Sequence, residues 1–195
     1  NFLQAIFDAT ERPAGSAVVI GGDGRYLNAT VIRKAIRMAA ANGVAKVIVG
    51  QNGLLSTPAA SNLIRQRKAA GGIVLSASHN PGGPDGDFGI KYNIANGGPA
   101  PERVTGAIHA RTTTINRWLT VEAPDVDLDI VSETQVGEMI VSVIDPVADY
   151  ADLMESLFDF DAIRAAVERG CTMRFAAMSA VTGPYAVEII EKRLG

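Results

Sequence analysis

The sequence has little of what typically stabilises secreted or membrane proteins. Its 195 residues include a single cysteine, Cys171, so no internal disulfide can form, and we expect a cytoplasmic protein in a reducing compartment. No apolar run approaches the ~18–20 residues that span a bilayer, so we expect no membrane partner. Charge of one sign is also scarce, because 18 Lys and Arg residues against 21 Asp and Glu residues leave a net charge of −3. This balance offers no basic surface for a nucleic acid.

What is present suits a folded protein. Hydrophobic residues make up 47% of the chain and charged residues 20%, a balance typical of chains that bury a core. The length exceeds one domain of ~150 residues and falls short of two. Because the chain begins at Asn1 rather than at a methionine, we expect it to be part of a longer protein.

Short β-branched runs alternate with longer segments of helical periodicity. Strands are predicted at residues 17–21, 44–50, 72–77 and 139–144. Helices are predicted at residues 30–42, 57–70 and 101–118. This alternation predicts an α/β fold in which a largely parallel mixed sheet is sandwiched by helices. Residues 119–135 are polar and contain Pro124, so we expect an irregular connection there.

A second α/β unit is predicted to begin after Pro146. Helical periodicity occurs at residues 147–157 and 160–169, a strand is predicted at residues 172–177, and a final helix runs to the last residue. We therefore predict two domains, with residues 1–150 forming the first and residues 151–195 beginning a second domain of similar α/β type.

The glycine-rich segment 71–101 contains the residues best suited to chemistry. Ser78 and His79 follow the third predicted strand, and Asn80-Pro81-Gly82-Gly83 after them predicts a turn. Ligands of open α/β sheets bind beyond the carboxyl ends of the strands. A serine displayed there can act as a nucleophile, with backbone N–H groups nearby to hold an anion. The residues alone leave open that Ser78 only caps or closes the turn.

Several motifs occur together in one order along the chain. They are Gly21-Gly22-Asp23-Gly24-Arg25, Gly50-Gln51-Asn52-Gly53 with Ser56-Thr57-Pro58, Ser76-Ala77-Ser78-His79-Asn80-Pro81-Gly82-Gly83, Gly86-Asp87-Phe88-Gly89-Ile90-Lys91, and Asn96-Gly97-Gly98-Pro99-Ala100-Pro101-Glu102. In this order they resemble the α-D-phosphohexomutases, most closely the phosphoglucomutases. The eight-residue segment from Ser76 to Gly83 carries most of the resemblance, because glycine clusters alone are common.

The resemblance implies a function and a set of site residues. In this family a serine, matched by Ser78, donates a phosphoryl group to a hexose phosphate and takes back the other phosphoryl group. It implies interconversion of glucose 1-phosphate and glucose 6-phosphate, with glucose 1,6-bisphosphate as primer and intermediate, and Mg²⁺ bound partly through the phosphate on Ser78. Lys91 and His79 are the other implied catalytic residues. We predict that Arg25 and Asn80 bind substrate phosphate.

The residues themselves leave simpler interpretations open. Lys91 lies in an alternating stretch and could be a solvated strand residue, and His79 could only hydrogen-bond the turn. Arg25 could equally meet a phosphate or pair with Asp23. Asp85-Gly86-Asp87 could hold a metal, although carboxylates at this spacing are usually turn residues. His109 has no matched role, and we interpret it as a surface residue.

The chain also departs from the family pattern. The acidic Asp-Gly-Asp-Gly-Asp-Arg loop that binds Mg²⁺ in the family does not occur in these 195 residues, and Ala176-Ala177-Met178-Ser179 stands where the family tends to have Asp-Ala-Met-His. We therefore expect the chain to need the remaining domains of a full-length enzyme as partners. A phosphomannomutase, a non-catalytic phosphoprotein or adaptor, and a phosphate-binding module without turnover are the alternative functions.

Overall fold

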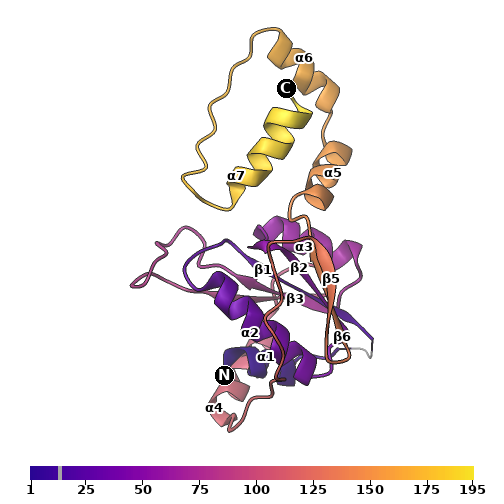
Figure 1. Ribbon diagram of the computed structural model, residues 1–195. Helices are drawn as coiled ribbons and strands as arrows, with labels where there is room; N and C mark the ends of the chain where they lie inside the picture. Colours follow the sequence, from indigo (N-terminus) through magenta and orange to yellow (C-terminus); the bar gives the residue numbers. More distant parts are fainter. Residues whose placement is uncertain (13–14) are drawn as a thin grey trace.

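The computed structural model describes residues 1–12 and 15–195 (Figure 1). The strands are β1 (Ala17–Gly22), β2 (Lys46–Leu54), β3 (Gly71–Leu75), β4 (Ile90–Ile94), β5 (Ser132–Val136) and β6 (Met139–Ile144). The helices are α1 (Phe2–Ala9), α2 (Asn28–Ala41), α3 (Thr57–Gln66), α4 (Glu102–Thr114), α5 (Ala148–Leu157), α6 (Phe160–Glu168), α7 (Thr182–Tyr185) and a π-helical continuation, η1 (Ala186–Arg193). None of the helices in the described residues is long and apolar enough to cross a membrane.

The described strands form one mixed sheet in the order β4-β3-β1-β2-β6-β5. The four central strands are parallel, and β4 and β5 pair antiparallel at the two edges. Because successive residues of a strand face opposite sides of a sheet, β1 sends Val18 and Ile20 to one apolar cluster and Val19 to the other. Helices α1, α2 and α4 cover the first face, and α3 and α5 cover the second. The predicted α/β fold with its largely parallel sheet is confirmed.

Some predicted elements are wrong at their ends or in kind. Residues 132–136 form the edge strand β5 rather than an irregular connection. The strand pairs with β6 and buries Val136 in the core, while its polar residues 133–135 are exposed. Residues 172–177 form no strand. Residues 172–176 are exposed, and no strand in the described part of the chain lies beside the segment to pair with its backbone groups. Helix α3 ends at Gln66 rather than residue 70, just before Lys68 takes a positive φ of 50°.

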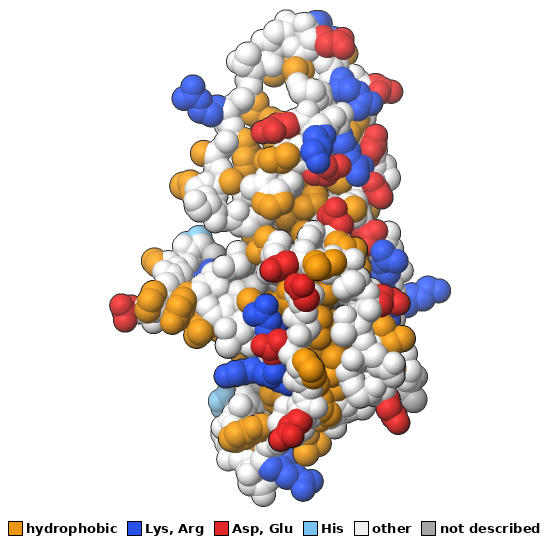
Figure 2. Space-filling model, in the orientation of Figure 1, with side chains coloured by type: hydrophobic (Ala, Val, Ile, Leu, Met, Phe, Trp, Pro, Cys, Tyr) orange, Lys and Arg blue, Asp and Glu red, His pale blue; other side chains and the backbone are white. Residues whose placement is uncertain are grey.

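The C-terminal segment, residues 151–195, consists of helices and one long extended stretch (Figure 1). Large hydrophobic side chains remain exposed there, and Figure 2 shows such side chains between the helices of this segment. The exposed hydrophobic residues of this segment include Leu157, Phe158, Met173, Phe175 and Met178. The expected boundary near Tyr150 lies inside α5, and the division of the chain at that point stays a prediction.

Candidate active site

The polar residues singled out in the sequence meet at the carboxyl edge of the parallel strands. Asp23 and Arg25 follow β1, and the loop from residue 76 to residue 89 follows β3, which lies next to β1 in the sheet. The chain leaves β1 towards β2 on one side and leaves β3 towards β4 on the other. Connections that diverge in this way leave a crevice at the sheet edge, where ligands of α/β proteins bind.

The loop from residue 76 to residue 89, here called the serine loop, holds Ser78 in an unusual backbone conformation. Ser78 has a φ of +57°, a left-handed region that costs a non-glycine residue about 1–3 kcal/mol. Its N–H donates to the Ser76 hydroxyl oxygen at 3.0 Å, and the Ser76 N–H donates to the Gly89 carbonyl at 2.9 Å. A Cβ on Gly89 would lie 2.3 Å from the Ser76 carbonyl oxygen, so only glycine lets the two ends of the loop approach.

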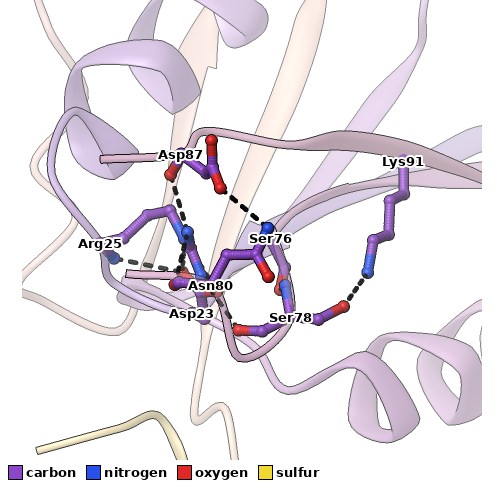
Figure 3. Close-up of polar contacts among 7 residues, drawn as sticks. All are labelled: Asp23, Arg25, Ser76, Ser78, Asn80, Asp87 and Lys91. Atoms are coloured by element: carbon purple, nitrogen blue, oxygen red, sulfur yellow. Dashed lines mark hydrogen bonds and ion pairs between the residues drawn. The ribbon is translucent and has the colours of Figure 1, made fainter. Parts of the chain in front are cut away.

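Lys91 reaches the hydroxyl of Ser78. Its Nζ donates to Ser78 Oγ at 3.0 Å, and Figure 3 shows the side chain extending from β4 towards the serine loop. The antiparallel register of the β3–β4 pair, with Lys91 opposite Val74, brings the lysine close to the residues that follow β3. Both side chains are exposed to solvent. An ammonium group beside an accessible hydroxyl can stabilise negative charge that develops on that oxygen.

The hydrogen bonds of the Arg25 guanidinium go to other groups of the protein. Nε donates to both carboxylate oxygens of Asp23 at 3.0 and 3.1 Å, and Nη2 donates to Asp23 Oδ2 at 2.8 Å. Nη2 also donates to the carbonyl of Ser78 at 3.1 Å, while Nη1 donates to the carbonyls of Asp87 at 2.7 Å and Asn80 at 3.4 Å. A guanidinium has five N–H donors, and these contacts use all of them. The structure thus shows the pairing with Asp23 that was one of the two interpretations of Arg25.

Asp23 joins the arginine to the rest of the serine loop. Burial alone would raise the pKa of the Asp23 carboxyl, but hydrogen bonds from Arg25 and Ser76 outweigh it and lower that pKa below its ordinary value of 3.8. The same pair raises the pKa of Arg25, through its hydrogen bond to Asp23. Asp23 therefore stays ionised at neutral pH and holds both Arg25 and the serine whose hydroxyl accepts the Ser78 N–H.

Asn80 and His79 do not bond the Ser78 hydroxyl as Lys91 does: one braces the loop and the other lines the cleft. Asn80 Nδ2 donates to Asp87 Oδ2 at 2.8 Å, which makes Asp87 a residue that braces the turn. His79 is exposed and lines the cleft, and in the described part of the chain its side chain has no hydrogen-bond partner. The imidazole is free to meet a ligand there. His109 is an exposed residue of α4, as expected.

Comparison with known proteins assigns the chain to a family. Residues 1–117 match the family model described as "Phosphoglucomutase/phosphomannomutase, alpha/beta/alpha domain I". The chain belongs to the phosphoglucomutase/phosphomannomutase family.

Individual members of the phosphoglucomutase/phosphomannomutase family resemble the whole chain. The phosphoglucomutase of Rhizobium radiobacter is 65% identical over 195 residues, and the chloroplastic phosphoglucomutase of Arabidopsis thaliana is 48% identical over 198. These alignments cover 100% of this chain but 36% and 32% of the two relatives. The chain also superposes on a crystal structure of the exocytosis-sensitive phosphoprotein pp63/parafusin (phosphoglucomutase) from Paramecium, in its open form, with a TM-score of 0.94 and 41% sequence identity. This superposition covers 100% of this chain and 38% of the Paramecium chain. The chain thus spans about a third of the length of its relatives.

A cleft of about 730 Å³ lies in front of Ser78 in this phosphohexomutase domain. Ser78 and His79 line one side, and the N-terminus of α3, with Thr57 and Pro58, lines another. Residues 178–182 form a further wall, which sequence reasoning missed because the family motifs around Ser78 lie about a hundred residues away in the chain. The Gly183-Pro184-Tyr185 sequence after that wall was the available signal.

The residues of this chain provide only part of a magnesium site. In residues 1–12 and 15–195, no group of three or more His, Cys, Asp or Glu side chains is arranged to hold a metal ion. Asp23 and Asp87 accept hydrogen bonds from Arg25 and Asn80, so their carboxylates are committed to the loop. The donor set does not fit Mg²⁺, which prefers an octahedral shell of oxygen ligands, and we route no step through the metal here.

Replacing Asp23 by asparagine tests its hold on the loop. The Asp23→Asn substitution leaves Arg25 without its anion, so we expect turnover of the complete protein to fall about 10²-fold, as for other displaced catalytic groups. We also expect the free energy of unfolding of this chain to fall by about 1–3 kcal/mol at pH 7. Urea unfolding followed by the fluorescence of Trp118 measures the second effect.

The pH dependence of the same measurement has a defined sign. Because the pKa of Asp23 is lowered on folding, its contribution is fully present above the ordinary value of 3.8 and is lost as pH falls through the folded-state pKa. The difference in stability between wild type and Asp23→Asn should therefore shrink below about pH 4. Asp161→Asn is the control, because the ion pair between Asp161 and Arg164 lies at the surface, where such a pair contributes less than about 1 kcal/mol to stability. An equal loss in both variants would contradict the role of Asp23.

Proposed function

We propose that the complete protein is a phosphoglucomutase that interconverts glucose 1-phosphate and glucose 6-phosphate. The observation that carries the proposal is the position of Ser78 Oγ, exposed at a cleft on a braced left-handed turn and 3.0 Å from Lys91 Nζ. A phosphoryl donor needs this accessibility, because the acceptor oxygen must approach in line with the bond that breaks.

The reaction needs two transfers of one phosphoryl group each. The 6-hydroxyl of glucose 1-phosphate attacks the phosphorus on phospho-Ser78, the P–Oγ bond breaks, and glucose 1,6-bisphosphate forms. The bisphosphate then turns in the cleft, and Ser78 Oγ attacks the phosphorus at C1, which releases glucose 6-phosphate and restores phospho-Ser78. Lys91 stabilises the negative charge on Oγ in both steps. His79, free in the cleft, takes the proton from the attacking 6-hydroxyl in the first transfer and gives it to the C1 oxygen that leaves in the second.

The remaining site residues have supporting roles in this proposal. Arg25 fixes the serine loop through its carbonyl groups, and any contact it makes with substrate phosphate requires the release of one of these bonds. Asn80 retains one amide hydrogen beyond the one given to Asp87, and we assign that hydrogen to substrate phosphate. The Mg²⁺ that the family implies would be held by the phosphate on Ser78 together with carboxylates from the rest of the complete protein, and it would supply positive charge near the transferred group.

The organisation of the protein follows from the same proposal. Residues 1–150 form the domain that carries the phosphoserine, residues 151–195 begin a second domain, and the remaining domains of the full-length enzyme complete the cleft. Glucose 1,6-bisphosphate primes the serine. We place the protein in the cytoplasm, with the single cysteine as support. Phosphomannomutase activity is the alternative within the family.

A non-catalytic phosphoprotein is the second candidate function. The likeness to pp63/parafusin, described as an exocytosis-sensitive phosphoprotein, supports it, as does the Ala176 to Ser179 segment. Both candidates require phosphate on Ser78, and only the enzyme requires that the phosphate return to a sugar. Release of labelled hexose phosphate from phospho-Ser78 therefore separates them.

We expect the isolated 195-residue chain to show no mutase turnover. The reaction needs a second phosphate site and a metal held by carboxylates as well as by the phosphoserine, and a lone phosphate competes poorly with water for Mg²⁺. A coupled assay that follows glucose 6-phosphate from glucose 1-phosphate, with Mg²⁺ and the bisphosphate primer, measures this. The complete protein should turn over in the same assay and should prefer glucose 1-phosphate to mannose 1-phosphate. Robust turnover by the isolated chain would contradict the division of the site between domains.

A further inference from the structure

Tyr185 joins three parts of the chain through one hydroxyl group. Its Oη accepts the backbone N–H of Ser56 at 3.0 Å and donates to the carbonyl oxygen of Pro146 at 2.9 Å. Tyr185 lies at the end of α7 and is 7% exposed, although most of the C-terminal segment around it is exposed. The ring packs edge-to-face on Tyr150, with centroids 5.6 Å apart.

Both partners of the hydroxyl are placed to affect the cleft. Ser56 is the N-cap of α3, and its side chain accepts the Ala59 N–H at the helix end that lines the cleft. Pro146 lies between β6 and α5, where the chain leaves the sheet for the C-terminal segment. Burial raises the pKa of the Tyr185 phenol, which keeps the hydroxyl neutral and able to donate and accept at once.

The segment that leads into α7 has one other apolar support, because Val181 packs against the buried cluster on the α3 face of the sheet. Residues 178–182 line the same cleft as Ser78 and His79, yet Met178 is 90% exposed and Ser179 is exposed as well. Both residues have positive φ values, 49° and 61°, which are costly for side chains other than glycine. Backbone bonds from Ala180 to Ala177 and from Gly183 to Ala180 stay within the segment and do not tie it to the sheet. Val181 and Tyr185 make the contacts that do so, and Tyr185 is the more deeply buried of the two.

We propose that Tyr185 is a positioning residue, whose hydroxyl holds residues 178–182 in place as a wall of the substrate cleft that Ser78 also lines. The proposal rests on the proposed function, because it assigns this wall to the binding of hexose phosphate. It also gives a part of the chain beyond the matched residues 1–117 a defined place in the site. Loss of the hydroxyl leaves the phosphoserine machinery intact and displaces the wall.

The Tyr185→Phe substitution in the complete protein tests this directly. Phenylalanine keeps the ring and its contact with Tyr150 but leaves the Ser56 N–H and the Pro146 carbonyl unpaired. We expect the KM for glucose 1-phosphate to rise about tenfold, because the displaced wall binds the substrate less well, with kcat changed less than about threefold. Amide hydrogen exchange, measured by mass spectrometry, should quicken in peptides that cover Ser56 and residues 178–185.

Tyr92→Phe is the matched control. Tyr92 is a partly buried tyrosine on β4 whose hydroxyl interacts with Thr10, away from the cleft. It should lose comparable stability without the rise in KM. An unchanged KM in Tyr185→Phe, unchanged exchange at residues 178–185, or an equal rise in KM in Tyr92→Phe would each overturn the proposal. If wild type shows no turnover, the proposed function fails, and the exchange measurement alone decides whether Tyr185 holds the wall.

Discussion

The Ser78→Ala variant of the complete protein should have no measurable mutase turnover. Ser78 Oγ is the only group in the proposed reaction that carries the phosphoryl group between the two halves of the cycle, so no neighbouring group can replace it. The fold should survive, because the side chain is exposed and surface substitutions usually change stability by less than about 0.5 kcal/mol. Steady-state turnover and thermal unfolding, measured on the same preparation, separate the two effects.

Ser61→Ala is the control for the loss of a hydroxyl. Ser61 is a residue of α3 that accepts a hydrogen bond from Arg65 and does not line the cleft. Its variant should retain wild-type turnover. Substantial turnover in Ser78→Ala, at a level that repeated purification does not remove, would show that Ser78 is not the phosphoryl carrier.

The Lys91→Ala variant should lose about two to three powers of ten in kcat. Lys91 Nζ donates to the oxygen on which charge develops. Removal of the ammonium group therefore raises the free energy of the transition state more than that of the ground state. KM for glucose 1-phosphate should change much less. Lys91→Arg should recover only part of the loss, because a planar guanidinium cannot occupy the position of the compact ammonium group.

Lys34→Ala provides the matched control for charge. Lys34 is an exposed residue of α2 that lines a different groove, on the face beside Trp118. Its loss changes the net charge by the same amount and should leave kcat unchanged. A near wild-type kcat in Lys91→Ala would return Lys91 to the interpretation as a solvated strand residue.

The order of strands and helices could be predicted because local patterns determine it. Runs such as Ala17 to Ile20 are β-branched and end in glycine, and the structure has β1 there. Residues 172–177 also look like a strand, with Met173 and Phe175 alternating, but a strand needs a partner that this segment does not have. The polar strand β5 shows the converse, since pairing with β6 determines its structure more than its own composition does.

The site could be predicted as a set of residue types but not as a set of contacts. The motif around Ser78 identified the serine and Lys91, and the β3–β4 pairing explains why they meet. The sequence left two interpretations of Arg25, because its partners in the serine loop lie more than fifty residues away and only the folded sheet brings them together. The place of residues 178–182 in the cleft could not be predicted for the same reason, since Tyr185 meets Ser56 only in the folded chain.

The central claim is that Ser78 carries the phosphoryl group, and peptide mapping tests it most directly. The complete protein is incubated with glucose 1,6-bisphosphate and Mg²⁺, digested, and analysed by mass spectrometry with fragmentation that resolves Ser76 from Ser78. We predict one phosphoryl group on Ser78, which is lost when excess hexose monophosphate is added and is absent from Ser78→Ala. Phosphate on Ser76 alone, or no phosphate on this peptide during turnover, would contradict the account.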